Sequence, residues 1–396
     1  PETSWNKRTE RDLLDELDDI LTRSIRSRMV SDVPLGAFLS GGIDSSIVVA
    51  IMTKLSSQPI KTFTIGFNEK KYDESFHAKK VSEYLGTEHY TEILQVDTLL
   101  ELMPVFVEEY DEPFFDYAAF PMMAVSRLAK RHVTVALSGD GGDELFGGYH
   151  YYKIAKYLKP FFSMPIIFRK ALSSIVSLSN KHQLKLLAGA LNQEDDIASF
   201  TFIRSIAKDF NTTLLPEIIS KTKSMNDLFN RTSSFFPAGI CASEKGMRLD
   251  LQYTLPDDYL QKVDVASMSF SIEARVPMLD HSIVEWSMRL PVKWKIRKNI
   301  NKYLLRKLAY RYIPKEILNR PKQGFGVPVN NWLRGPLMKQ VEQRFNDSTL
   351  FKHLPLDQNN VIKLWELHLN RDRNVHPLLW AILMLLEFTD KHIIEK

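Results

Sequence analysis

The chain has a single cysteine, Cys241, among its 396 residues. An internal disulfide is therefore excluded, and a reducing compartment, the cytoplasm, is expected. Long hydrophobic runs are also missing: the run at 380–386 ends at Glu387, well below the roughly 18 apolar residues of a membrane span, and indicates a buried helix. The first residues lack the apolar segment of a signal peptide. The sequence thus predicts a cytoplasmic protein without a membrane anchor.

The charge is almost balanced, because 52 Lys and Arg residues face 48 Asp and Glu residues. A formal net charge of +4 does not indicate a nucleic-acid partner, which favours a strongly basic surface. We interpret a modest basic cluster at 293–307 as a solvated helix face. His77 and His89 have no metal-site spacing to a cysteine, so no histidine metal centre is predicted.

The chain does contain an alternation of strand-like and helix-like runs in its first part. The strand-like runs are 37–39, 60–67, 88–94 and 133–137, and the helix-like runs are 9–29, 47–55, 74–85, 97–107 and 117–130. Such alternation predicts an α/β fold with a doubly wound parallel sheet. The strand signal fades from Tyr151 onward, so the large C-terminal part is predicted to be mainly α-helical.

The most informative motif is a predicted turn between the strand at 37–39 and the next helix. It reads Ser40-Gly41-Gly42-Ile43-Asp44-Ser45-Ser46. Consecutive glycines allow a tight turn with inward N–H groups, and the N-terminus of a helix favours a bound phosphate. Without the lysine of a Walker A motif, the loop suits a released pyrophosphate and hence adenylation. An ordinary glycine-rich turn is the alternative.

A second, acidic motif follows the strand at 133–137. It reads Ser138-Gly139-Asp140-Gly141-Gly142-Asp143-Glu144. Ligands bind beyond the carboxyl ends of parallel strands, so both motifs are expected to face one nucleotide. Asp44 and Asp143 supply the hard oxygen ligands that Mg²⁺ prefers. A helix-capping role for Asp44 and a turn role for Asp143 are the alternatives.

These motifs resemble a known family. The first is similar to the pyrophosphate loop of the PP-loop ATP pyrophosphatases. Further motifs resemble the C-terminal synthetase domain of the glutamine-dependent, class B asparagine synthetases: 137–149, 267–268, 273–277, 279–280 and 320–326. The resemblance covers nearly the whole chain, with the motifs in the right order.

The resemblance implies an ATP-dependent carbon–nitrogen ligase that uses Mg²⁺. The β-carboxylate of L-aspartate attacks the α-phosphorus of ATP to give β-aspartyl-AMP and pyrophosphate, and ammonia then gives L-asparagine and AMP. The residues implied to hold nucleotide and pyrophosphate are Leu39, Ser40, Gly41, Gly42, Asp44, Ser45, Ser46, Ile65, Ser138 and Gly139. Asp44 and Asp143 are implied to hold Mg²⁺.

Two catalytic residues are implied in the same way. Lys322 corresponds to the family's catalytic lysine, whose cation stabilises the charge that develops at phosphorus and at the acyl carbon. Asp140 stands where some relatives have the longer Glu, and is expected to accept a proton from the attacking amine. A surface lysine and a turn carboxylate are the alternatives. Glu273 and Arg275 are expected either to contact the ligand or to form a buried ion pair.

The resemblance also implies a division of the chain. Residues 1–30 form a lead-in helix, residues 31–150 the ATP-binding α/β core, and residues 151–396 a mainly helical part that carries the lysine loop. The resemblance also implies a glutaminase domain, and nothing like it is found in this sequence, so we expect a fragment, an enzyme that uses free ammonia, or one that receives ammonia from a separate glutaminase subunit. Self-association into a homo-oligomer stays open.

Other functions are compatible with the same loops. A related amide ligase, such as a β-lactam-forming or peptide-cyclising enzyme, shares the pyrophosphate loop and the lysine. A catalytically silent nucleotide-binding partner is disfavoured by the intact Asp44, Asp143 and Lys322. A tRNA-thiolating enzyme ranks last, because it needs reactive cysteines and the lone Cys241 is far from the loops in sequence.

Overall fold

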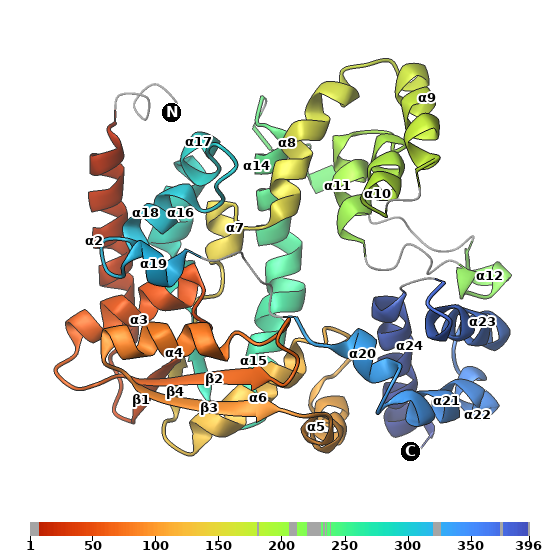
Figure 1. Ribbon diagram of the computed structural model, residues 1–396, viewed down its shortest axis with the longest axis horizontal. Helices are drawn as coiled ribbons and strands as arrows, with labels where there is room; N and C mark the ends of the chain where they lie inside the picture. The colour runs from red at the N-terminus through yellow and green to blue at the C-terminus, as the bar shows by residue number, and fades with distance from the viewer. Residues whose placement is uncertain are drawn as a thin grey trace.

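Five parallel strands form one sheet in the part of the chain that our computed structural model describes (Figure 1). The described residues are 8–179, 182–205, 212–219, 231–232, 234, 236–237, 239–319, 326–372 and 375–394. The strands are β1 (Leu35–Phe38), β2 (Lys61–Phe67), β3 (Glu88–Leu94), β4 (Val135–Leu137) and β5 (Glu273–Arg275), in the order β3-β2-β1-β4-β5. The predicted α/β fold with a parallel, doubly wound sheet is confirmed.

The register of the sheet brings the two sequence motifs together. Ala37 of β1 pairs with Leu137 of β4, so both strands end at nearly the same level. The loop after β1 leads into α3 (Ile43–Leu55), and the loop after β4 leads into α7 (Gly142–Phe146). Both motifs therefore lie side by side at the carboxyl edge of the sheet.

Helices cover both faces of the sheet (Figure 1). α3 and α4 (Ser75–Leu85) lie over one face, and α6 (Ala119–Lys130) and α15 (Gln261–Met268) over the other. This arrangement buries most of the central strands β1, β2 and β4, and β1 and β4 are accordingly apolar, as expected for parallel strands covered on both faces. All residues of β2 after Lys61 are buried.

The helix predicted at 9–29 is present as α2 (Glu10–Arg28). Thr9 and Asp12 form a reciprocal capping box at its start, and basic residues occupy its last turn, which complements the helix dipole. Leu13, Leu17 and Leu21 are fully buried in the core that α2 shares with α3 and α18 (Tyr303–Ala309). Apolar residues at helical spacing thus attach α2 to the sheet domain.

The C-terminal part is mainly helical, as the sequence predicts. Its elements, with the remaining helices, are α5 (Val96–Glu109), α8 (His150–Phe162), α9 (Ile166–Ser177), α10 (His182–Leu191), α11 (Asp196–Arg204), α12 (Pro216–Ile219), α14 (Ala242–Leu249), η2 (Asp250–Leu260), η3 (Pro277–Leu279), α16 (His281–Arg289), α17 (Val292–Lys295), α19 (Lys315–Leu318), α20 (Val329–Leu333), α21 (Met338–Asn346), α22 (Ser348–Phe351), α23 (Gln358–Leu369), α24 (His376–Thr389) and η4 (Asp390–Ile394).

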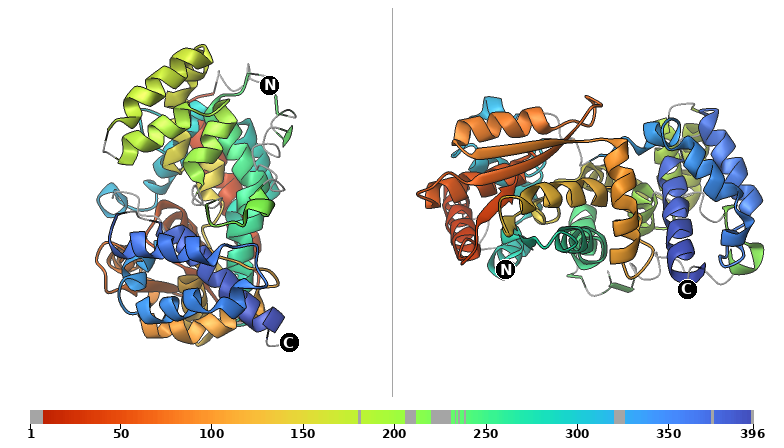
Figure 2. Two further views of the ribbon diagram at one scale, coloured as in Figure 1. Left: turned by 90° about the vertical axis from the view of Figure 1, so that its right-hand side faces the viewer. Right: turned by 90° about the horizontal axis from the view of Figure 1, so that it is seen from below.

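The last helices form a group beside the sheet rather than on it (Figure 2). α24 packs against α5, and the rings of Phe106, Phe120 and Trp380 contact one another in sequence, with centroid separations of 4.9 and 5.6 Å. Trp380 is fully buried, so the apolar run at 380–386 is a core helix, as predicted. In the described part of the chain, no helix combines the length and the apolar character needed to cross a membrane.

β5 is an element that the sequence analysis did not predict. It has three residues, none of them buried, and pairs in parallel with β4 as the edge strand. Such a short, polar segment carries no alternation by which a strand could be recognised. The helical part of the chain therefore contributes one strand to the sheet.

Candidate active site

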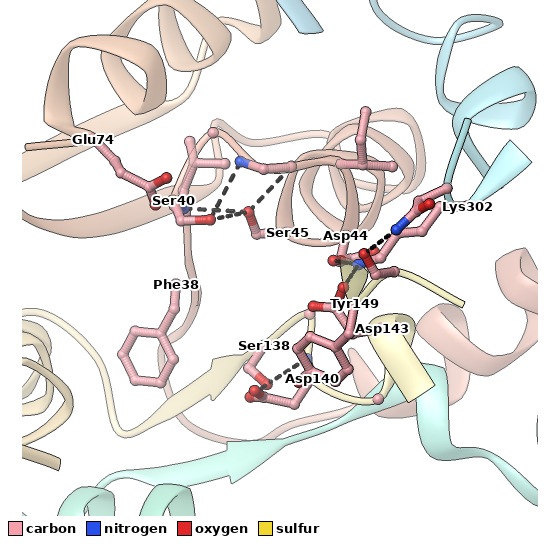
Figure 3. A pocket seen from close by; sticks show the side chains of 18 of the residues that line it. Phe38, Ser40, Asp44, Ser45, Glu74, Ser138, Asp140, Asp143, Tyr149 and Lys302 are labelled. Carbon is pink, nitrogen blue, oxygen red and sulfur yellow. Dashed lines mark hydrogen bonds and ion pairs between the residues drawn. The ribbon is translucent and has the colours of Figure 1, made fainter. Parts of the chain in front are cut away.

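A cavity of about 1030 Å³ opens at the carboxyl edge of the sheet (Figure 3). The loops after β1 and β4 form one part of its wall, and residues of η2, α15 and α18 form another. The volume is slightly above the range of about 300–1,000 Å³ for ligand pockets. The cavity is therefore large enough for a nucleotide and a second, small substrate.

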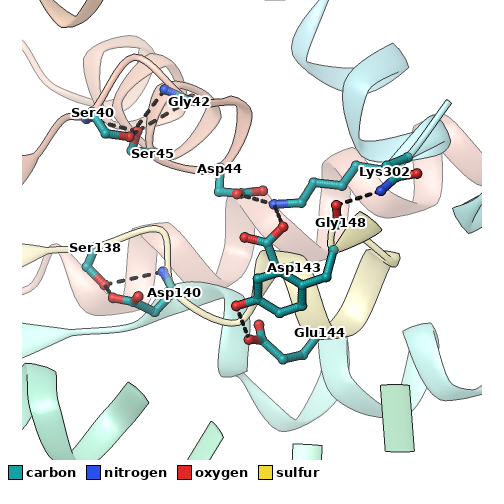
Figure 4. Close-up of polar contacts among 12 residues, drawn as sticks. Ser40, Gly42, Asp44, Ser45, Ser138, Asp140, Asp143, Glu144, Gly148 and Lys302 are labelled. Carbon is teal, nitrogen blue, oxygen red and sulfur yellow. Dashed lines mark hydrogen bonds and ion pairs between the residues drawn. The ribbon is translucent and has the colours of Figure 1, made fainter. Parts of the chain in front are cut away.

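The loop after β1 is held in shape by its own hydroxyl groups (Figure 4). The Ser40 backbone N–H donates to Ser45 Oγ at 3.2 Å, and the Gly42 N–H donates to Ser40 Oγ at 3.2 Å. Gly42 is the N-cap of α3 and supplies no side chain, so Asp44 is not the capping residue. The loop is thus preorganised at a helix N-terminus, where phosphate is favoured.

Two glycines allow the loops to approach their neighbours. Gly41 has a left-handed φ of +71°, and a Cβ atom there would lie 2.7 Å from the backbone N of Ala78 in α4. A Cβ atom on Gly139 would lie 2.6 Å from the backbone N of Ser45. The loop after β4 therefore contacts the start of α3 backbone to backbone, which only glycine permits.

Asp44 and Asp143 converge on one cation, the ammonium group of Lys302 at the start of α18 (Figure 4). Lys302 Nζ is 2.8 Å from Asp143 Oδ1 and is also paired with Asp44 Oδ2. Burial alone would lower the pKa of Lys302, but Asp143 and Asp44 raise it above its usual value. The lysine is therefore charged at neutral pH.

Lys302 is a site residue that sequence reasoning missed. It is 5% exposed and lines the cavity, so the interpretation of 293–307 as a solvated helix face is wrong for Lys302. Lys295 of the same cluster is also buried. The four-residue spacing of Lys302 and Arg306 could have indicated a common helix face, but not that this face lies toward the cavity.

Glu144 is a second site residue whose chemistry was not predicted. It lines the cavity, is 2% exposed and accepts a hydrogen bond of 2.8 Å from the Tyr149 hydroxyl. Burial, and then the charge of Asp143, raise the pKa of Glu144 to about 7. Its place in the acidic motif was visible in the sequence, but its burial was not.

Most of the predicted site residues line this cavity. They are Leu39, Ser40, Gly41, Gly42, Asp44, Ser45, Ile65, Ser138, Gly139, Asp140 and Asp143. Asp140 Oδ2 accepts a hydrogen bond of 2.6 Å from Ser138 Oγ, so this carboxylate both shapes its turn and faces the cavity. Ser46 does not line the cavity and is fully buried.

Lys322 lies outside the described residues. The nearest described residues on either side, Asn319 and Gly326, both line the cavity. Glu273 and Arg275 do form an ion pair, with Arg275 Nε 2.6 Å from Glu273 Oε1. The Glu273 side chain is 56% exposed and neither residue lines the cavity, so both expectations for this pair, ligand contact and a buried ion pair, are wrong.

The donor set fits a magnesium ion shared with phosphates. Across the described residues, no group of three or more His, Cys, Asp or Glu side chains is arranged to hold a metal. Asp44 and Asp143 offer two carboxylates that one cation can reach together, as their common contact with Lys302 shows. Mg²⁺ is usually held by one or two carboxylates together with substrate phosphates and water.

Comparison with known proteins identifies the family. A family model described as "Asparagine synthase" matches residues 16–390. The chain belongs to the asparagine synthase family. The resemblance seen in the motifs is therefore confirmed.

Curated relatives agree with this assignment. "Asparagine synthetase [glutamine-hydrolyzing] 1" of Bacillus subtilis is 32% identical over 96% of this chain and 59% of its own length. A "Putative asparagine synthetase [glutamine-hydrolyzing]" of Mycobacterium tuberculosis is 31% identical over 94% of this chain and 57% of its own length. "Putative asparagine synthetase [glutamine-hydrolyzing] 2" of Methanocaldococcus jannaschii is 37% identical over 65% of this chain and 49% of its own length. The chain thus spans about half the length of the curated relatives it matches.

Proposed function

We propose that this chain is the synthetase part of an asparagine synthetase. It adenylates the β-carboxylate of L-aspartate with ATP, and the acyl group then passes to ammonia. The observation that carries the proposal is that the loops after β1 and β4 bring a pyrophosphate-type loop and two converging carboxylates to one cavity. Membership of the asparagine synthase family supports the choice of substrates.

The first step needs a loop that stabilises the leaving pyrophosphate. We assign this role to N–H groups at the start of α3 and to the hydroxyls of Ser40 and Ser45, because both serines line the cavity beside the N-terminus of α3. Asp44 and Asp143 would hold Mg²⁺, which screens the charge of the phosphates. Lys302 adds a fixed positive charge at the same place. Leu39, Ile65 and Gly139 are proposed to hold adenosine through their backbone groups.

The second step needs a base for the attacking ammonia and a cation near the acyl carbon. We assign the base to Asp140, which faces the cavity. We assign the cation to Lys322, because Asn319 and Gly326 on either side of its segment both line the cavity. Collapse of the tetrahedral intermediate releases L-asparagine and AMP.

The source of ammonia is proposed to be a glutaminase domain or subunit, since the relatives are named glutamine-hydrolysing. We keep the proposed division into a lead-in helix at 1–30, a nucleotide-binding core at 31–150 and a mainly helical part at 151–396. β5 joins the last of these to the core, which suggests that the two fold as one unit. A cytoplasmic location is part of the same proposal.

ATP–pyrophosphate exchange tests the proposed function without a nitrogen donor. Purified protein with Mg²⁺ is assayed with L-aspartate, L-glutamate, acetate or no acid. The proposal predicts exchange that depends on L-aspartate, and formation of L-asparagine when ammonium is added. Exchange driven by a different carboxylate would instead support a related amide ligase, and exchange with no acid at all would contradict both.

A further inference from the structure

An ion pair forms part of the cavity wall outside the two nucleotide loops. Lys262 of α15 places Nζ 2.7 Å from Oδ2 of Asp116, which lies just before α6. Both residues line the cavity, with side chains 14% and 20% exposed. Neither residue is needed to bind phosphate or Mg²⁺ in the function proposed above.

Both charges of this pair are fixed in position. The Ala118 backbone N–H donates to Asp116 Oδ1 at 2.9 Å, while Lys262 occupies Oδ2. The Lys262 ammonium lies over the Tyr259 ring, 4.8 Å from its centroid. An ammonium group has three N–H donors and Asp116 accepts one of them, so donors are left for a ligand in the cavity.

The surrounding groups keep Lys262 charged. Burial alone would lower the pKa of Lys262, but Asp116, followed by Asp258 and Asp140, raises it above the usual value. Asp140 belongs to the loop after β4, and its negative charge contributes to the raised pKa of Lys262. In the same loop, Gly139 contacts the start of α3. The pair therefore lies within electrostatic reach of the site where the acyl-adenylate would form.

A structural role alone explains this pair poorly. Desolvation of two charges offsets most of their attraction, so a partly buried ion pair contributes little net stability. Leu255 and Val263 line the cavity on the same helical segment, and their apolar side chains lower the local dielectric. A fixed pair of opposite charges in such a wall is complementary to a ligand that also carries two opposite charges.

We propose that Lys262 and Asp116 bind the zwitterionic head of the amino-acid substrate, with Lys262 contacting its α-carboxylate and Asp116 its α-ammonium group. This inference rests on the proposed function and assigns the substrate residues that function lacks. With the head fixed, the side-chain carboxylate of aspartate is left free to reach the α-phosphate. Glutamate has one more methylene and would place its carboxylate past that position.

Two analogues of L-aspartate each lack one of the two charged groups of the zwitterionic head. Succinate lacks the α-ammonium group, and β-alanine lacks the α-carboxylate. ATP–pyrophosphate exchange is measured with L-aspartate, succinate and β-alanine for the wild-type protein, Lys262→Met and Asp116→Asn. Loss of a hydrogen bond to a charged group predicts a fall of about tenfold to a hundredfold in kcat/KM for aspartate in each variant.

The decisive comparison is the change in kcat/KM that each variant shows for aspartate, succinate and β-alanine. Lys262→Met is expected to change kcat/KM for β-alanine much less than for aspartate, and Asp116→Asn to do the same for succinate. Lys262→Arg is expected to restore part of the aspartate activity. Lys245→Met serves as the matched control, because Lys245 pairs with Asp196 at 3.2 Å away from the cavity. The ATP dissociation constant, measured without amino acid, reports whether each variant retains its fold.

Each outcome has one meaning. Equal losses for all three acids in Lys262→Met, with ATP affinity retained, would show a purely structural pair and overturn the inference. Wild-type protein that exchanges with L-aspartate while the variants fail selectively supports it. Wild-type protein that shows no acid-dependent exchange would remove the proposed function, and this inference with it.

Discussion

The two sides of the cavity are built in different ways. On the loop side, residues close in sequence make the site: Ser40, Gly42 and Ser45 contact one another within a single turn. On the helical side, Lys302 reaches Asp44 across a separation of 258 residues. Contacts between residues close in sequence can be recognised as a motif. The positive charge of Lys302 comes from the start of a distant helix, whose sequence does not indicate that it packs against Asp44.

Lys302→Met breaks the contact between the two sides and has the largest expected effect. Asp44 and Asp143 would then face each other without the ammonium group, and breaking a buried ion pair costs about 3–5 kcal/mol. Urea unfolding at neutral pH measures this loss. Mg²⁺ should recover part of it in the variant, because a hard cation binds the same pair of carboxylates.

Lys245→Met is the control for that experiment, since it removes a lysine from an ion pair of similar length, 3.2 Å, away from the cavity. It should lose much less stability, and its response to Mg²⁺ should match that of the wild-type protein. A Lys302→Met variant as stable as the wild type would show that the helical side does not hold the loops together.

Glu144→Gln sharpens the comparison by testing a buried acid of the loop side. Burial raises the pKa of Glu144 from 4.5 to about 7, so the folded state binds this proton more tightly than the unfolded state. The resulting stability is complete below about pH 4.5 and is lost as the pH rises through 7. At one pKa unit per 1.36 kcal/mol, the loss between these limits is about 3 kcal/mol.

The measurement is the free energy of unfolding by urea at pH 5 and pH 8 in both proteins. The wild-type protein should lose more stability than Glu144→Gln between these pH values. An identical pH dependence in the two proteins would mean that Glu144 is ionised without cost in the folded state.

Gly139→Ala tests the backbone contact between the two loops. The added Cβ would lie 2.6 Å from the Ser45 backbone N, so the loops must separate, at a cost of about 1–3 kcal/mol. Weaker ATP binding is expected as well, by equilibrium titration. Gly86→Ala also introduces a side chain at a glycine, but no atom lies within 4 Å of its Cβ, so only the strain of its positive φ remains. Its ATP affinity should not change.

Glu273→Ala has the smallest expected effect. Its exposed ion pair with Arg275 is worth less than about 1 kcal/mol, because water screens such charges. ATP–pyrophosphate exchange should be unaltered. A large loss of exchange would place β5 in the site and contradict its description as a supporting edge strand.

The sequence was sufficient to predict the first four strands of the parallel sheet, its flanking helices and the loop side of the cavity. These depend on periodicity and on turns whose glycines and hydroxyls act locally. Ser46 shows that belonging to a motif does not ensure that a residue lines the site, because consecutive residues of a helix point about 100° apart. Ser45 therefore lines the cavity, while Ser46 is directed into the core.

The helical side could not be predicted in the same way. The chemistry of Lys262 and Lys302 depends on burial and on carboxylates that come from distant segments. Their positions follow from the packing of α15 and α18, which no local pattern records. β5 was not predicted for a related reason, since its position is set by its pairing with β4.

The central claim, adenylation of aspartate, is tested most directly by tracing the β-carboxylate oxygen atoms of the substrate into the products. L-Aspartate labelled with ¹⁸O in its β-carboxylate is turned over with ATP, Mg²⁺ and ammonium, and the products are analysed by mass spectrometry. Attack of the carboxylate on the α-phosphorus predicts that AMP acquires one labelled oxygen. Label in inorganic phosphate, with ADP as the other product, would show attack at the γ-phosphate and contradict the account.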